Sequence, residues 1–153
     1  PAVAIRELNE KISEDSLEDR FITMCMLVLD LESNKVQVVN AGHMPPLVCR
    51  KSSKPFELGA DNRTVPLLVM ETYPYDTLEF EVEPDDILLM YTDGLTESMN
   101  SKSELYSIGR VIQQAEGVNS GEELTRKLVA DARSFAGDVP QQDDICLVCC
   151  AFH

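Results

Sequence analysis

The sequence predicts an α+β domain whose strands form antiparallel sheets. A strand pattern over Phe21–Leu31 is followed by a polar turn and a return strand that begins at Val36, which is typical of a hairpin. Helical patterns gather in the second half, over residues 105–115 and 122–135. Strands joined by short turns, with helices in separate groups, favour the α+β class over alternating strand–helix units.

The first half begins with a helix over residues 2–13, because Ile5, Leu8 and Ile12 recur at helical spacing. Residues 13–20 are polar and acidic and are predicted to connect this helix to the hairpin. Shorter strand patterns follow at residues 36–39, 47–50 and 56–58. Residues 59–76 are predicted to form a loop, because they contain Gly59, Asn62, Pro66 and Pro74.

The second half begins with a strand at residues 78–82, in which apolar residues alternate with glutamates. This alternation predicts one buried face and one acidic, solvated face. The continuous apolar run Ile87–Tyr91 predicts a buried strand, and residues 145–150 predict the last strand. Ser120 and Glu123 form a capping-box pattern at the start of the helix over residues 122–135.

Composition indicates one globular domain over all 153 residues. The net charge of −14 argues against nucleic acid as a partner, because its phosphates would be repelled. No apolar stretch approaches the roughly 20 residues that span a bilayer, so no membrane insertion is expected. Five cysteines, an odd number scattered through strand patterns, predict reduced, buried thiols in a cytoplasmic protein.

Two acidic stretches are the candidate functional residues. Thr92-Asp93-Gly94 follows one apolar strand, and Asp143-Asp144 precedes another. Carboxylates at strand ends point into solvent from a rigid base, which suits hard cations such as Mg²⁺ or Mn²⁺. Taken singly, each stretch is also explained by ordinary structure, since Asp-Gly is a turn signal and Asp-Asp is typical of a solvated loop.

Four stretches in one order resemble the bacterial SpoIIE-like branch of the metal-dependent serine/threonine protein phosphatases, the protein phosphatase 2C-like family. They are Phe21–Met24, Asn40–Pro46, Asp86–Glu97 and Asp143–Ile145. The match extends over nearly the whole chain.

The resemblance implies a four-layer α/β/β/α sandwich and two metal ions, Mn²⁺ or Mg²⁺. In this family the metals activate a water that attacks the phosphoester, so no residue is expected to act as a catalytic nucleophile. The same resemblance makes Asp93 and Asp143 metal ligands. It gives Asp144, Thr92 and Gly94 supporting roles around them, with Thr92 and Gly94 shaping the turn, and a structural role is favoured for His43.

Two departures from the family pattern stand out. The family's N-terminal hairpin, which supplies a further metal-binding Asp, would precede residue 1, so the chain corresponds to the C-terminal two-thirds of such a domain. Where the family favours Pro-Leu-Gly, this chain has Pro66-Leu67-Leu68. A backbone conformation open to glycine is therefore expected to have changed here.

The leading functional interpretation is a phosphatase that removes phosphate from phosphoserine or phosphothreonine on a signalling protein. The resemblance suggests an anti-sigma-factor antagonist as substrate and a sensor or receiver domain upstream. The alternative is a catalytically silent protein-binding module of the same fold, which the missing hairpin favours and the retained carboxylates disfavour. A metal-binding domain with a hydrolase activity other than that of a phosphatase is a third possibility.

Overall fold

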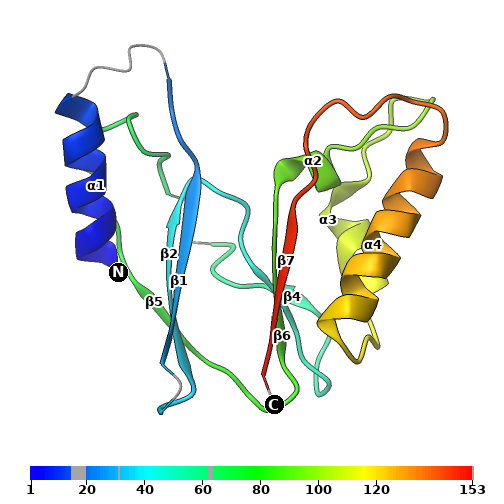
Figure 1. The fold of residues 1–153 in the computed structure, drawn as a ribbon, viewed down its shortest axis with the longest axis horizontal. Coiled ribbons are helices and arrows are strands. Elements are labelled where there is room, and N and C mark those ends of the chain that lie inside the picture. Colours follow the sequence, from blue (N-terminus) through cyan, green and yellow to red (C-terminus); the bar gives the residue numbers. More distant parts are fainter. Residues whose placement is uncertain (15–19, 31, 62–63, 153) are drawn as a thin grey trace. The chain divides into compact units, whose positions relative to one another are not determined.

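The computed structural model describes residues 1–14, 20–30, 32–61 and 64–152 (Figure 1). These residues form two compact units. The first unit consists of Pro1–Pro45 and Gly59–Val82, and the second of Pro46–Leu58 and Glu83–His153. Parts of the predicted connection 13–20, the end of the predicted strand at Leu31 and the loop residue Asn62 lie outside the described residues.

The first unit combines one helix with a three-stranded antiparallel sheet. Its elements are α1 (Ala2–Glu14), β1 (Met24–Asp30), β2 (Lys35–Ala41) and β5 (Leu78–Glu81), and the sheet order is β1-β2-β5. The predicted hairpin is confirmed, with Met24 opposite Ala41 and Asp30 opposite Lys35. The Asp30 carboxylate accepts hydrogen bonds from the Ser33 hydroxyl and from two backbone N–H groups, which lowers its pKa and fixes the turn.

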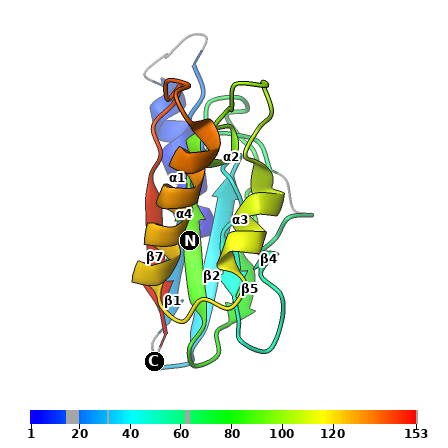
Figure 2. The same cartoon turned by 90° about the vertical axis from the view of Figure 1, so that its right-hand side faces the viewer.

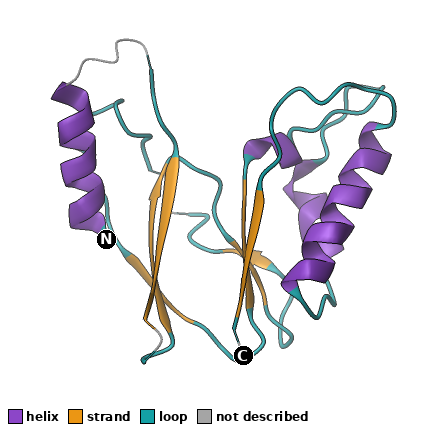
Figure 3. Ribbon diagram, viewed as in Figure 1, coloured by secondary structure: helices purple, strands orange, loops and turns teal. Residues whose placement is uncertain are grey.

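α1 lies beside this sheet (Figure 3), and its apolar side chains pack against β2. Ile5 is fully buried against Val39 and Ala41 of β2 and against Leu67 and Tyr75 of the following loop. Asn9 is also fully buried, and its side-chain amide donates to the carbonyls of Met70 and Glu71, at 2.8 Å each. These bonds satisfy the buried amide and hold the loop against the helix.

The second unit combines a four-stranded antiparallel sheet with three helices. The strands are β3 (Leu47–Cys49), β4 (Phe56–Glu57), β6 (Ile87–Tyr91) and β7 (Leu147–Ala151), in the order β4-β3-β6-β7. The helices are α2 (Asp93–Thr96), α3 (Ser107–Ala115) and α4 (Gly121–Ala136). β6 is an inner strand, and its leucines Leu88 and Leu89 are fully buried, as its continuous apolar sequence predicts.

α3 and α4 lie side by side, and α4 lies against β7 (Figure 2). The Tyr106 hydroxyl donates to Asp131 of α4 at 2.7 Å, and the Arg110 guanidinium lies 4.6 Å from the Phe135 ring. The predicted N-cap is confirmed, because the Ser120 hydroxyl accepts from the N–H of Glu123 at 3.1 Å. The Glu123 carboxylate accepts from the N–H of Asn119, one residue before the cap.

The predicted elements therefore match the structure, with boundaries that differ by a few residues. The strand predicted to begin at Phe21 begins at Met24, and the last strand begins at Leu147, two residues later than predicted. α2 was not predicted, since four residues are too few for a helical period.

Candidate functional site

The two acidic stretches meet where β6 ends and β7 begins, at one end of these paired strands of the second unit. β6 and β7 are antiparallel neighbours, and Tyr91 at the end of β6 lies opposite Leu147 at the start of β7. Thr92 and Asp93 follow the end of β6. Asp143 and Asp144 precede the start of β7 at the same end of the sheet. The sequence placed both stretches at strand ends, and the pairing of those strands brings them together.

Thr92 joins the two stretches through three hydrogen bonds. Its hydroxyl donates to the Asp144 carbonyl at 2.8 Å and accepts from the N–H of Cys146 at 2.9 Å. Its backbone N–H donates to the Cys146 carbonyl at 3.1 Å. The Thr92 hydroxyl thus fixes the backbone of Asp144 and Cys146 next to the residue that leads into Asp93.

Gly94 allows the two backbones to approach closely. A Cβ atom at this position would lie 2.5 Å from the Asp144 carbonyl oxygen and 3.0 Å from its carbonyl carbon. Gly94 lies in the single helical turn α2, and it is not among the residues with positive φ, so its part in shaping the turn stays a prediction. Glycine is needed here because any side chain would collide with the Asp143–Asp144 backbone.

The carboxylates of Asp93, Asp143 and Asp144 are exposed. The backbone carbonyl of Asp93, rather than its carboxylate, accepts the bonds that close α2, from the N–H of Glu97 and the hydroxyl of Thr96. One carboxylate oxygen of Asp143 accepts from the N–H of Asp144 at 2.7 Å, and its carbonyl accepts from the Gln141 side chain. The carboxylate of Asp93 and the second oxygen of Asp143 are therefore not engaged in these bonds.

These residues fit part of a hard-cation site. Mg²⁺ is usually held by one or two carboxylates together with several waters, and Asp93 and Asp143 supply two carboxylates on adjacent, pinned segments. Across the described ranges, no group of three or more His, Cys, Asp and Glu side chains is placed to hold a metal ion. Among the described residues, Asp93 and Asp143 are therefore two candidate ligands rather than a complete set.

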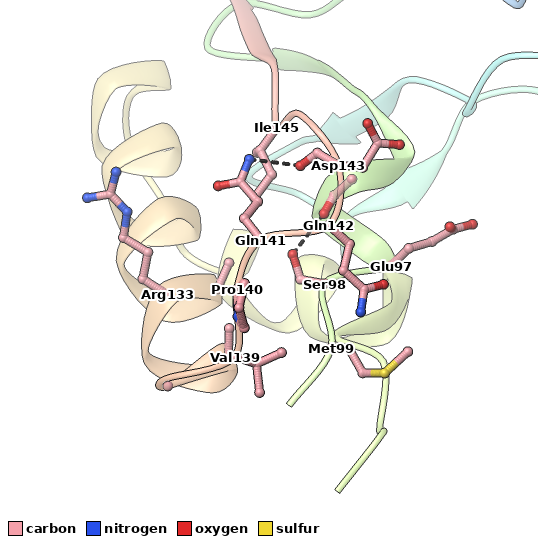
Figure 4. A pocket seen from close by; sticks show the side chains of 14 residues that line it. Glu97, Ser98, Met99, Arg133, Val139, Pro140, Gln141, Gln142, Asp143 and Ile145 are labelled. Carbon is pink, nitrogen blue, oxygen red and sulfur yellow. Dashed lines mark hydrogen bonds between the residues drawn. The ribbon is translucent and has the colours of Figure 1, made fainter. Parts of the chain in front are cut away.

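A pocket of about 330 Å³ lies beside this edge and was not anticipated from the sequence (Figure 4). Gly94 and Asp143 belong to its lining, together with the C-terminal part of α4 and the loop that follows. Its only sequence signal is the set of small residues Ala132, Ala136 and Gly137. These residues do not indicate a pocket until the position of the helix is known.

Two predictions concern the first unit. His43 forms backbone hydrogen bonds with the Asn40 side chain, and its ring nitrogen Nδ1 lies 3.1 Å from the Met44 carbonyl oxygen, which agrees with a structural role. The expected change of backbone at the Pro66-Leu67-Leu68 segment is wrong. Leu68 has φ 71°, in the region that glycine favours, and its N–H donates to the buried Asn9 side chain at 2.8 Å.

The cysteines are free, as predicted, but not all are buried. Cys49 is buried, whereas Cys146, which precedes β7, is exposed. Burial raises the pKa of Cys25 and Cys149 to about 11 and that of Cys49 to about 12. Burial, followed by the charge of Glu57, also raises the pKa of Tyr91 at the end of β6.

Comparison with known proteins gives a consistent result. The family described as Stage II sporulation protein E (SpoIIE) matches residues 1–153. Phosphoserine phosphatase RsbU of Bacillus subtilis is 21% identical over 150 residues, which cover 97% of this chain and 44% of RsbU. The chain spans less than half the length of the curated relatives it matches.

Solved structures share the fold. The PP2C domain of SiaA from Pseudomonas aeruginosa matches with a TM-score of 0.83 and 16% identity, covering all of this chain and 60% of that domain's chain. The manganese-presoaked phosphatase domain of SpoIIE from Bacillus subtilis matches with a TM-score of 0.72 and 17% identity, covering 98% and 64%. The α+β class with antiparallel sheets, of protein phosphatase 2C type, is confirmed. Within the described ranges, no helix has the length and apolar character needed to cross a bilayer.

Proposed function

The chain belongs to the SpoIIE family, and from this premise we propose that it is the larger part of the catalytic domain of a metal-dependent phosphoprotein phosphatase. The reaction is hydrolysis of a phosphoserine or phosphothreonine ester on a signalling protein. The observation that supports it most is the pinning of the Asp93 and Asp143 segments against each other by Thr92. Two exposed carboxylates on fixed backbone are what such chemistry requires of this part of the domain.

Asp93 and Asp143 are the proposed metal ligands, for Mn²⁺ or Mg²⁺. When bound, divalent ions supply positive charge that polarises the phosphoester and activates water. Carboxylate oxygens are the donors that these hard cations prefer. The remaining ligands are proposed to come from residues upstream of Pro1, as the family resemblance implies.

The other residues of the site position the ligands. The Thr92 hydroxyl holds the Asp144 carbonyl, and Gly94 leaves the space that this carbonyl occupies. The N–H of Asp144 donates to the Asp143 carboxylate and thereby limits its rotation. Residues that orient ligands in this way commonly affect metal affinity nearly as strongly as the ligands themselves.

The proposed substrate is a phosphorylated anti-sigma-factor antagonist. The support is the relation to the phosphoserine phosphatase RsbU and the membership of the SpoIIE family. A sensor or receiver domain upstream of the phosphatase domain is proposed on the same basis.

Activity of the full-length protein on a phosphoserine protein tests this proposal. Asp93→Asn and Asp143→Asn should each lower kcat/KM at least a hundredfold, and chelation of divalent ions should abolish turnover. Asp138→Asn is the matched control, because Asp138 is an exposed acid of the same unit outside the site, and it should retain full activity. Activity that survives chelation contradicts the mechanism. An inactive protein that still binds a signalling partner would instead support the catalytically silent module.

A further inference from the structure

The pocket beside Asp143 lies entirely within the second unit. Its walls are the end of α2 with Glu97 to Met99, the last turns of α4, and the loop that leads to Asp143 (Figure 4). Gly94 and Asp143 belong both to this pocket and to the proposed metal site. A group seated in the pocket is therefore adjacent to a phosphoester held at that site.

Small residues keep the pocket open. Ala132 and Ala136 are one helical turn apart and so lie on the same face of α4. Neither they nor Gly94 has a side chain that reaches across the space. Met99, Val139 and Ile145 add apolar surface to the lining, and Gln141 is held by its hydrogen bond to the Asp143 carbonyl. Apolar groups thus make up the larger part of the lining, beside polar side chains such as Ser98 and Gln142, and the loop wall is held in place.

We propose that this pocket receives an aliphatic side chain of the phosphoprotein substrate, from a residue close to the phosphoserine. This inference rests on the proposed function, since it needs the phosphoester to be bound at Asp93 and Asp143. The volume of about 330 Å³ is at the lower end of the range for ligand pockets, which suits one or two side chains better than a cofactor. An extended chain advances about 3.5 Å per residue, so the side chain comes from within about three residues of the phosphoserine.

The charged groups of the lining have both signs. They are the carboxylate of Glu97 and the guanidinium of Arg133, while the Asp143 carboxylate is the proposed ligand of a cation. The preference therefore rests on the aliphatic side chain rather than on acidic or basic neighbours. The substrate class is a phosphoserine segment with an aliphatic residue close to the phosphoserine.

Phosphopeptide binding to the full chain tests the proposal. The probes are nonapeptides with a central phosphoserine, in which one leucine is moved through the flanking positions of a glycine–serine background. At one or two positions leucine should tighten Kd about tenfold relative to alanine, as expected for burial of its side chain. In the wild-type protein, the same peptide should shift the backbone amide resonances of Ala132, Ala136 and Gly137.

Two variants locate the effect. Ala136→Leu fills the pocket and should remove the preference for leucine, whereas Ser134→Leu adds the same side chain at an exposed position of α4 outside the pocket and should leave it intact. Asp93→Asn should weaken binding of the leucine and alanine peptides alike, whereas Ala136→Leu should weaken binding of the leucine peptide alone. This difference separates failure of the proposed metal site from failure of the pocket. A leucine preference equal in Ala136→Leu and wild type, or no shift of the pocket amides with any peptide, overturns the proposal.

Discussion

The Thr92 hydroxyl donates a hydrogen bond of 2.8 Å to the carbonyl of Asp144, and this bond joins the two acidic stretches. The stretches are about fifty residues apart in the chain, and the same hydroxyl also accepts from the N–H of Cys146. The position of Asp143 relative to Asp93 therefore depends on an uncharged side chain.

Thr92→Val keeps the shape of the side chain and removes both hydroxyl hydrogen bonds. The free energy of unfolding should fall by about 1–2 kcal/mol, because two backbone groups lose their partner. Thr92→Ser retains the hydroxyl and should lose less. Urea denaturation of the three proteins measures the difference, and equal stability of the valine and serine variants would show that the hydroxyl bonds contribute nothing.

Gly94→Ala should destabilise the protein by about 1–3 kcal/mol, since its Cβ would lie 2.5 Å from the Asp144 carbonyl oxygen and the backbone must move. Gly109→Ala is the matched control. It lies in α3, where the nearest atom to an added Cβ is 3.8 Å away. There alanine should stabilise by about 0.5–1 kcal/mol through its helix propensity. Thermal melts of both variants should therefore shift in opposite directions, and a shift upward for both would refute the close approach at Gly94.

At position 68, glycine should give a more stable protein than alanine. Its φ of 71° is unfavourable for any residue with a Cβ atom. Leu68→Gly and Leu68→Ala lose a similar amount of side-chain packing, so their difference reports the backbone. The glycine variant should be more stable by about 1 kcal/mol in denaturant unfolding. If alanine is the more stable, as at an ordinary helical or extended position, the left-handed conformation is not adopted.

Stability should decrease at high pH because of the buried thiols. Cys25 keeps its proton up to a pKa of about 11 in the folded protein, whereas its ordinary value is 9.0. The unfolded chain releases that proton first, so the contribution is fully present below pH 9 and is lost as the pH rises through about 11.

Denaturant unfolding at pH 8 and at pH 10.5 measures this effect. Cys25→Ala should reduce the loss of stability between the two values by about 1 kcal/mol. An identical pH dependence in wild type and Cys25→Ala would show that the Cys25 thiol is not protected by the fold.

Patterns of period two and of helical spacing were sufficient to predict most elements. The hairpin, the buried strand β6 and the Ser120 cap were predictable because each depends on neighbouring residues alone. The role of Gly94 was not, because it depends on a backbone about fifty residues further along the chain. Leu68 was misjudged for a similar reason, since its conformation is held by a hydrogen bond to Asn9 on a distant helix.

The candidate site was predictable only in part. Asp93 and Asp143 carry local signals, namely an acid at the end of an apolar run and a pair of acids before another. The small residues Ala132 and Ala136 do not by themselves indicate a pocket, because the pocket also needs α2 and the loop at Gln141 beside them.

Titration of the chain with Mn²⁺ by calorimetry tests most directly whether Asp93 and Asp143 together hold a divalent metal. Wild type and Asp138→Asn should bind with the same affinity. Asp93→Asn and Asp143→Asn should each bind at least tenfold more weakly, as expected when one of two carboxylate ligands is removed. Equal binding of Mn²⁺ by wild type and Asp93→Asn would contradict the assignment of the site.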